Sequence, residues 1–271
     1  LTDVTGVQTC ALPISFAYRL LSKISNEQGE ARDFITRLES ILTQNLEEKI
    51  KEAEEKIESS DFLKATESVV SAKEKYILPG KFVEKYDAPL GQLFLKIMNR
   101  VYHAGSNKYR FLDFSSPDPL KSEDASSLKF EWEEGCLKIS RGSISFDPKD
   151  FHLFAGMGRL ESNDEKIAVY LSNNNRRIYS LQISGEAKAS YGAYHAKGGV
   201  KNEGNFQEVR NRWFSFAMFI ASGQMHWNLN GQNRFSSIHT DDHAINKIHL
   251  QFSSGKSSVV LLDNLYIGFR R

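Results

Sequence analysis

Residues 212–231, RWFSFAMFIASGQMHWNLNG, constrain the fold of this chain more than any other stretch. They predict two β-strands joined by a turn at Ser222 and Gly223. In the first strand apolar side chains occupy both faces, which is typical of a strand that is buried on both sides. One face carries Trp213, Ser215, Ala217 and Phe219, and the other carries Phe214, Phe216, Met218 and Ile220.

The second strand alternates between apolar and polar residues, as a strand with one buried face and one polar face does. The apolar face carries Met225, Trp227 and Leu229, and the polar face carries His226, Asn228 and Asn230. Asn230 and Gly231 then suit a tight turn with positive φ. The hairpin therefore predicts a β-sandwich with a polar face that is available for binding.

The composition is that of an ordinary globular protein. The chain has 271 residues, of which 40% are hydrophobic and 25% are charged, and its formal net charge is +1. A chain so close to neutral has no general attraction to phosphate backbones or anionic lipids, so we do not expect nucleic acid as a partner. No run approaches the roughly 18 apolar residues of a membrane span, and we expect no span.

Residues 4–14, VTGVQTCALPI, resemble the translation of a short-read sequencing adapter along their whole length. We therefore leave residues 1–14 out of the fold prediction. With them goes Cys10, and Cys136 remains as a single cysteine that can form no internal disulfide. A single thiol is compatible with any compartment. The native N-terminus, a signal peptide or an upstream domain are left open.

Apolar residues recur at spacings of three and four in residues 16–24, 31–58, 62–76 and 89–103, which predicts amphipathic helices. Together they define a helical bundle or hairpin over residues 15–105. Ser60 and Asp61 offer a helix cap. The small and bulky positions around residues 53–72 are spaced as in a tetratricopeptide repeat, with an ordinary helical hairpin as the alternative.

After residue 105 the helical spacing ends. Residues 106–127 are rich in turn-forming residues and predict a linker, and residues 128–271 predict an antiparallel β-sandwich of the jelly-roll type. The fold class is thus α+β in two segments. The expected strands are 128–132, 136–140, 151–160, 166–172, 177–184, 212–221, 224–230, 247–253 and 259–269.

The order of RWFSFAMFI, WNLNG, KIHLQFSS and VVLLDNLYIGF resembles the C-terminal half of concanavalin-A-like lectin and laminin-G-like sandwiches, over about residues 151–269. In those families a hairpin of this form precedes a last strand with an Asp-Asn or Asp-Asp pair, here Asp263 and Asn264. The resemblance implies a jelly-roll sandwich. Its members bind glycans, bind proteins or hydrolyse glycans, so the fold does not choose between these functions.

Retaining glycosidases of this kind need two carboxylates close together, usually alternating along one strand. The sequence shows no such run, and the nearest acidic cluster is Glu131, Glu133 and Glu134, in what resembles a strand edge. We therefore predict that the chain is not an enzyme.

Several polar residues are predicted to point outward from strands whose apolar residues fill the core. They are Tyr170, His226, Asn228, His249 and Gln251, and the Gly-rich loop predicted at 187–205 adds Tyr191, Tyr194 and His195. Imidazole, amide and phenol groups suit sugar hydroxyls and the apolar face of a pyranose ring. The alternative is that these residues coat a solvated sheet or lie under the helical bundle.

A metal site is a weaker possibility. Asp241 and Asp242 lie between His239 and His243 in a predicted loop and suit calcium chemically, with an ordinary polar loop as the alternative. We expect no other cofactor. The leading hypothesis is a noncatalytic, lectin-like sandwich that binds a glycan or polysaccharide, with an extracytoplasmic or secreted location favoured. The alternatives are a protein-interaction or structural module that uses the helical segment, and, third, a glycoside hydrolase.

Overall fold

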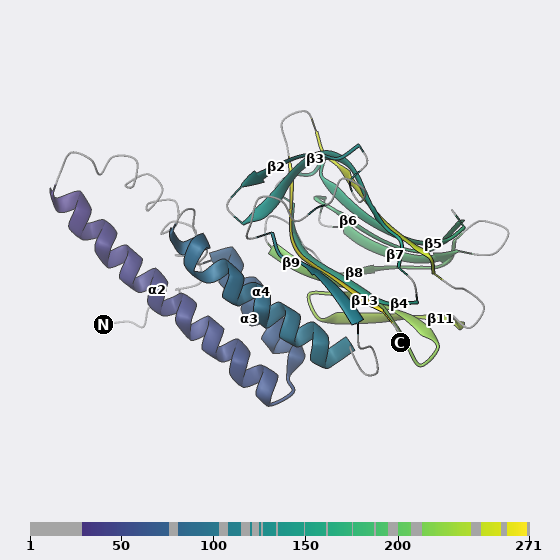
Figure 1. Cartoon of the computed structure of the whole chain (residues 1–271), viewed down its shortest axis with the longest axis horizontal. Helices are drawn as coiled ribbons and strands as arrows, with labels where there is room; N and C mark the ends of the chain where they lie inside the picture. The colour runs from purple at the N-terminus through teal and green to yellow at the C-terminus, as the bar shows by residue number, and fades with distance from the viewer. Residues whose placement is uncertain are drawn as a thin grey trace, which may run out of the picture.

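The computed structural model describes residues 29–75, 81–102, 108–114, 120, 125, 127–133, 135–148, 150–160, 162–174, 176–186, 188–194, 200–206, 213–239, 245–255 and 259–269. In this part of the chain, a layer of α-helices lies against one side of an antiparallel β-sandwich (Figure 1). The predicted fold class, N-terminal helices followed by an antiparallel sandwich, is confirmed. The adapter-like residues 4–14 and the helix predicted at 16–24 lie outside the described residues.

The described helices are α2 (Gly29–Glu58), α3 (Phe62–Lys75) and α4 (Lys81–Tyr102). Helix α3 starts after the predicted cap Asp61, whose carboxylate accepts a hydrogen bond from the Lys64 N–H at 3.4 Å. Helix α4 begins at Lys81, ahead of the predicted start, and Pro89 lies inside it. Phe82 and Tyr86 are buried, and the Tyr86 hydroxyl donates to Glu47 of α2 at 2.9 Å. This packing of the first turns offsets the hydrogen bond that Pro89 cannot make.

The strands form two layers, which we call sheet A and sheet B. Sheet A contains β1 (Lys108–Leu112), β2 (Lys129–Glu133), β4 (Phe151–Arg159), β9 (Trp213–Ala221), β10 (Gln224–Leu229), β11 (Gln232–His239) and β13 (Val260–Phe269). Sheet B contains β5 (Lys166–Asn173), β6 (Arg176–Ser184), β7 (Lys188–Tyr194), β8 (Val200–Phe206) and β12 (Lys247–Ser253).

Strand β3 (Cys136–Phe146) joins the two sheets. Its first half pairs with β13 and its second half pairs with β12, so the strand order runs β11-β10-β9-β4-β13-β3-β12-β5-β6-β7-β8. The bend falls at Gly142, which has a φ of +117° and whose Cβ, if it had one, would lie 2.4 Å from the Ser127 carbonyl oxygen. Only glycine fits this position without a shift of the neighbouring backbone.

Four strands were not predicted from the sequence. Strand β1 lies inside the predicted linker 106–127 and pairs with β13, so residues 108–112 belong to the sheet. Strands β7 and β8 replace most of the loop predicted at 187–205, and β11 extends the hairpin of β9 and β10. The loop prediction is wrong there because the polar, Gly-containing sequence hides the alternation of β7, which pairs with β6 and β8, and of the edge strand β8.

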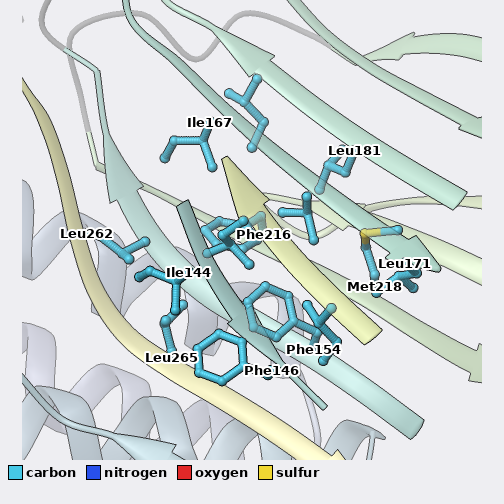
Figure 2. Close-up of a cluster of buried hydrophobic side chains, with 14 of the residues drawn as sticks. Ile144, Phe146, Phe154, Ile167, Leu171, Leu181, Phe216, Met218, Leu262 and Leu265 are labelled. Carbon is cyan, nitrogen blue, oxygen red and sulfur yellow. The ribbon is translucent and has the colours of Figure 1, made fainter. Parts of the chain in front are cut away.

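The main core lies between the sheets, where side chains from both layers interdigitate (Figure 2). Ile144, Phe146, Ile167, Leu171 and Leu181 meet Phe154, Phe216, Met218, Leu262 and Leu265 there. Phe214, Phe216, Met218 and Ile220 of β9 all belong to this core, as do Met225, Trp227 and Leu229 of β10. The predicted apolar faces of both strands are confirmed.

The other face of β9 packs against the helices. Trp213, Ala217 and Phe219 share a second apolar cluster with residues of α3 and α4, including Val69 and Phe94. Helix α2 packs on α3 and α4 on the side away from the sandwich (Figure 1). The helical layer thus covers the outer face of sheet A, which explains why β9 is apolar on both sides. None of the described helices is long and apolar enough to cross a membrane.

Candidate functional site

The residues predicted to bind a ligand lie on two opposite faces of the molecule. Asn228 of β10 lines a cavity together with residues of α3 and α4, and His226 stacks on Phe219 with ring centroids 4.9 Å apart. Both therefore belong to the outer face of sheet A, beside the helices. His249 of β12 and Tyr170 of β5 lie opposite each other on the outer face of sheet B. The outward-pointing residues therefore do not form one surface, because β10 and β12 belong to different sheets.

The aromatic residues expected on a rim loop are in a strand instead. Tyr191 and Tyr194 belong to β7. The Tyr191 ring packs toward the core, 4.9 Å from the Trp227 ring centroid. Tyr194 lies on the outer face of sheet B, where its hydroxyl is 3.2 Å from the Ser180 hydroxyl. His195 lies outside the described residues. Tyr194 alone of these three is placed to meet a ligand on sheet B.

A stack of planar groups dominates the outer face of sheet B. The Arg177 guanidinium lies over the Tyr170 ring at 3.8 Å, and the Tyr170 and His249 rings are stacked with centroids 6.4 Å apart. Tyr170 is only 6% exposed, so it supports the two groups beside it more than it offers its own surface. Its exposure was overestimated from the sequence because alternation gives the face of a residue and not what covers it.

His249 is held in place on the same face. Its Nδ1 lies 2.9 Å from the Ser145 hydroxyl on β3. Burial, followed by the charges of Lys247 and Arg177, holds the pKa of His249 below its ordinary value. The ring is therefore neutral at pH 7 and can both donate and accept a hydrogen bond. We call this surface the sheet B face, made up of Ser145, Tyr170, Arg177, Tyr194, His249 and Gln251.

A cavity of about 250 Å³ lies beside the sheet B face, at the turn between β5 and β6. A hydrogen bond from the Asn246 amide to Asn174 (3.0 Å), and one from the Asn174 N–H to Asn246 (3.1 Å), fix its rim. An apolar cavity of about 150 Å³ can hold benzene, so this space can hold one six-membered ring with substituents. The lining residues are Asn173, Asn174, Arg176, Arg177, Ile178 and Tyr194.

Sequence reasoning missed the asparagine and arginine residues of this cavity. The run NNNRR, residues 173–177, lies where one predicted strand ends and the next begins, and no binding role was predicted for it. The available signal was Arg177, the first residue of a predicted strand, where a long cation can fold back over a ring of the neighbouring strand. That contact depends on the register of β5 and β6, which the turn alone does not set.

The strands that carry the sheet B face contain no acidic residue. Neither Asp nor Glu occurs in β3, β5, β6, β7 or β12. The acidic residues considered in the sequence lie elsewhere: Glu131 is in β2 and pairs in register with Lys138 of β3, Glu133 ends β2, and Glu134 is outside the described residues. The four strands β5, β6, β7 and β12 carry Lys166, Arg176, Arg177, Lys188 and Lys247.

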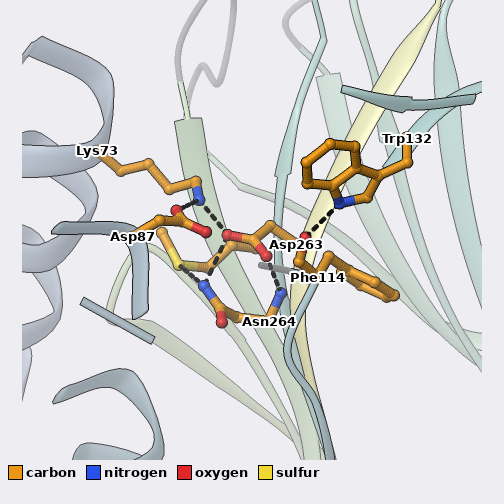
Figure 3. A network of polar contacts seen from close by, with 7 residues as sticks. Lys73, Asp87, Phe114, Trp132, Asp263 and Asn264 are labelled. Carbon is orange, nitrogen blue, oxygen red and sulfur yellow. Dashed lines mark hydrogen bonds and ion pairs between the residues drawn. The ribbon is translucent and has the colours of Figure 1, made fainter. Parts of the chain in front are cut away.

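A second group of polar residues is buried between the helices and sheet A (Figure 3). The ammonium of Lys73 in α3 contacts Asp87 of α4 at 2.6 Å and forms an ion pair with Asp263 of β13. The Asp263 carboxylate accepts two further hydrogen bonds from Asn264, at 2.7 Å from the side chain and 2.8 Å from the backbone. Lys73 also lies 4.8 Å above the Trp213 ring. We call Lys73, Asp87, Asp263 and Asn264 the buried charge cluster.

Burial and the charge of Asp87 raise the pKa of Asp263 to about 7, although Lys73 opposes this shift. The pKa of Asp87 is raised too, first by burial. One ammonium cannot neutralise two carboxylates, so one carboxyl group takes up a proton more readily than usual. Because Lys73 occupies the space between the carboxylates, we assign the cluster to holding the helices on the sheet.

Two residues of the buried charge cluster, Asp263 and Asn264, were visible in the sequence as the polar pair of the last strand. The expectation that the pair ends the strand is wrong: both residues lie inside β13, where Asn264 has a φ of +52°. Lys73 was missed. It follows Val69 by four residues and so falls on the apolar side of α3, which was the signal for a buried lysine.

Within the described ranges no group of three or more His, Cys, Asp or Glu side chains could hold a metal ion. Asp241 and Asp242, the calcium candidates, lie outside those ranges.

Comparison with protein-family models and with curated proteins finds no match. Among solved structures, the sandwich is similar to the β-glucanase of Bacillus licheniformis (10% identity, 61% of this chain and 99% of that chain, TM-score 0.48). It is also similar to the galectin LEC-6 of Caenorhabditis elegans (11% identity, 46% of this chain and 89% of that chain, TM-score 0.36). A third match is the laminarinase catalytic domain of Thermotoga maritima (12% identity, 56% of this chain and 82% of that chain, TM-score 0.41). All three TM-scores are below 0.5, so these likenesses carry no argument about activity or ligand.

Proposed function

We propose that this chain binds carbohydrate through the sheet B face and does not cleave it. The observation that supports this proposal is the arrangement of Arg177, Tyr170 and His249, stacked on one another beside a cavity of about 250 Å³. The groups that can reach a ligand there are a guanidinium, a neutral imidazole, the Tyr194 phenol and two asparagine amides. Such planar polar groups can donate hydrogen bonds to sugar hydroxyls and accept hydrogen bonds from them.

The charge of this face favours a sugar that carries a carboxylate. Arg176 and Arg177 both line the cavity, and the strands of the sheet B face have no acidic residue. A guanidinium binds a carboxylate through two parallel hydrogen bonds, which gives direction as well as energy. We therefore propose a uronic acid as the sugar class.

The same charge distribution supports binding without hydrolysis. Cleavage of a glycosidic bond by the common mechanisms needs one carboxyl group as acid and a second as nucleophile or base, less than about 10 Å apart. Strands β3, β5, β6, β7 and β12 supply neither. A hydrolase would need both groups from other elements at the same place.

The experiment is calorimetric titration of the intact chain with an oligouronate and with a neutral oligosaccharide of the same length. We expect the oligouronate to bind more tightly, and its affinity to fall as the ionic strength rises from about 0.01 M to 1 M. Arg177→Met and Tyr194→Ala should each weaken binding at least tenfold. The oligosaccharide should elute unchanged in chain length after incubation, and shortened products would overturn the noncatalytic part of the proposal.

Two histidines provide a matched control. His249 and His226 are both half-buried and both stacked on an aromatic ring, but they lie on opposite sheets. We expect His249→Ala to weaken sugar binding and His226→Ala to leave it unchanged. An equal effect of the two substitutions, or no binding of any sugar by the unmodified chain, would contradict the proposal.

One observation favours a second function, contact with another protein through the helices. Phe34 and Ile41 of α2 are 50% and 47% exposed and lie two turns apart on the same side of the helix. Sedimentation velocity over a range of concentrations tests contact between copies of the chain. An oligomer that dissociates when both residues are changed to Ser would support this function, and a monomer at every concentration would exclude self-contact.

A further inference from the structure

A second cavity, of about 240 Å³, lies on the opposite side of sheet A from the core, between the sheet and the helices. Its floor is formed by buried residues of β9 and by Met98 of α4, and its rim by the start of α3 and the turn between β10 and β11. The lining residues are Phe62, Leu63, Thr66, Met98, Ser215, Phe216, Ala217, Phe219, Asn228, Gly231 and Asn233. We call this space the α3 cavity.

One polar group on the floor of the α3 cavity is unsatisfied. Ser215 is 3% exposed, and its hydroxyl has no hydrogen-bond partner among the described residues. Its backbone is fixed, since Ser215 N–H donates to Asn230 Oδ1 at 2.9 Å and its carbonyl accepts from Asn230 N–H at 2.9 Å. A buried hydroxyl without a partner is costly, and this one belongs to a residue in the wall of a cavity whose backbone is fixed. A ligand that supplied the missing hydrogen bond would remove this cost.

Asn228 places a second polar group at the rim. Its Oδ1 accepts a hydrogen bond from Gly231 N–H at 2.9 Å, which orients the amide and leaves the NH₂ end to donate. The rest of the lining is largely apolar, with Phe62, Phe219 and Met98 among the contacts. None of the lining residues carries a charge. A charged ligand would lose its hydration there without gaining a counter-charge.

We propose that the α3 cavity binds a small, neutral, amphipathic molecule, consisting of an aromatic or branched apolar body with one hydroxyl or carbonyl group. The apolar body would lie against Phe62, Met98 and Phe219. The polar group would exchange a hydrogen bond with Ser215 on the floor. A cavity of about 150 Å³ is sufficient for benzene, so about 240 Å³ accommodates one ring with a short substituent.

The entrance to the α3 cavity is next to Leu63. This side chain is 47% exposed, and its Cδ1 lies 1.5 Å from the position that a Cβ on Gly231 would take. Leu63 thus rests against the turn between β10 and β11 and forms part of the rim.

The experiment is an NMR titration of the ¹⁵N-labelled chain with benzyl alcohol and, separately, with toluene, which has the same ring but no hydroxyl. We expect saturable shifts of the Ser215 and Asn228 amide signals, with benzyl alcohol bound more tightly. Ser215→Ala should weaken benzyl alcohol about two- to tenfold, the net contribution of one hydrogen bond, and leave toluene unchanged. Benzoate, with a charge in place of the hydroxyl, should not bind.

Two further variants keep the test decisive. Ala217→Leu fills the cavity with an isobutyl group and should abolish the binding of both probes in a chain that still unfolds cooperatively. Ser172→Ala removes a serine of β5 in sheet B that is also buried, at 6% exposed against 3% for Ser215, and should change neither probe's affinity. The proposal is overturned if benzyl alcohol gives no saturable shifts up to its solubility limit. It is overturned equally if Ser215→Ala leaves the ratio of the two affinities unchanged.

The site is independent of the sugar-binding proposal, because sheet A and the core separate the α3 cavity from the sheet B face. His249→Ala should therefore leave the binding of benzyl alcohol unchanged. A loss of benzyl alcohol binding in that variant would contradict the location of the site.

Discussion

Replacing Lys73 with Met removes the ammonium that lies between Asp87 and Asp263 while keeping a side chain of similar length. All three charged groups are at most 4% exposed, so no solvent enters to compensate the carboxylates. Breaking a buried ion pair by removing one partner typically costs about 3 to 5 kcal/mol. Against a total stability of roughly 5 to 15 kcal/mol, we expect Lys73→Met to leave a marginally stable chain at pH 8.

The loss should depend on pH in a defined direction. In the unmodified chain, burial and then the charge of Asp87 raise the pKa of Asp263 from 3.8 to about 7. The unfolded chain releases this proton near pH 4 and the folded chain only near pH 7. The stability that Asp263 contributes is thus fully present below pH 3.8. It is lost progressively as the pH rises from there through about 7, and the total loss in the free energy of unfolding is on the order of 4 kcal/mol.

Lys73 opposes the rise of the pKa of both carboxyl groups. Without it, Asp87 and Asp263 should take up protons at a still higher pH. At pH 5 both would be neutral in the folded Lys73→Met variant, so the destabilisation should be smaller there than at pH 8 by more than about 1 kcal/mol. Asp87→Asn removes a negative charge that raises the pKa of Asp263. This variant should lower that pKa, so its free energy of unfolding should depend less on pH than that of the unmodified chain.

Urea unfolding at pH 5 and pH 8, followed by tryptophan fluorescence, measures these free energies. Lys64→Met is the matched control, because Lys64 is in the same helix but its side chain is 61% exposed and pairs with Asp61 at 3.4 Å. We expect it to change stability by less than about 0.5 kcal/mol. The reasoning is refuted if Lys73→Met costs no more than Lys64→Met, or if its cost is the same at both pH values.

Two further predictions concern single contacts. Gly231→Ala should lower the free energy of unfolding by about 1 to 3 kcal/mol more than Gly223→Ala does, in thermal or urea unfolding. Both glycines have positive φ, 80° at Gly231 and 72° at Gly223. At Gly231, however, a Cβ would lie 1.5 Å from Leu63 Cδ1. Equal costs would show that Leu63 moves aside freely. Tyr266→Phe removes a hydroxyl that donates to Asn99 Oδ1 at 2.7 Å and links β13 to α4. We expect the free energy of unfolding to fall by about 1 kcal/mol in the same assay. An unchanged unfolding midpoint would exclude a contribution from this hydrogen bond.

The candidate site was only partly predictable. His249 and Gln251 were correctly placed on the outer face of β12, because alternation along a strand is a local property. Their partners were not predictable from the same signal. Arg177 reaches Tyr170 across the pairing of β5 with β6, and Tyr194 was expected in a loop because the sequence of β7 contains Gly and small residues. Register between strands depends on the whole sheet.

For residues 212–231, too, the sequence predicted the local structure and the tertiary structure decided the surroundings. Its sequence determined two strands, their faces and the tight turn at Asn230 and Gly231, since side-chain periodicity and positive φ are set by neighbouring residues. Only the tertiary structure decided what each face meets. The helices cover part of the side that carries Ser215 and Asn228, so these residues line a partly open cavity between the helices and the sheet instead of a flat surface. Coverage by a distant segment has no local signature, because it results from the burial of apolar surface summed over the whole chain.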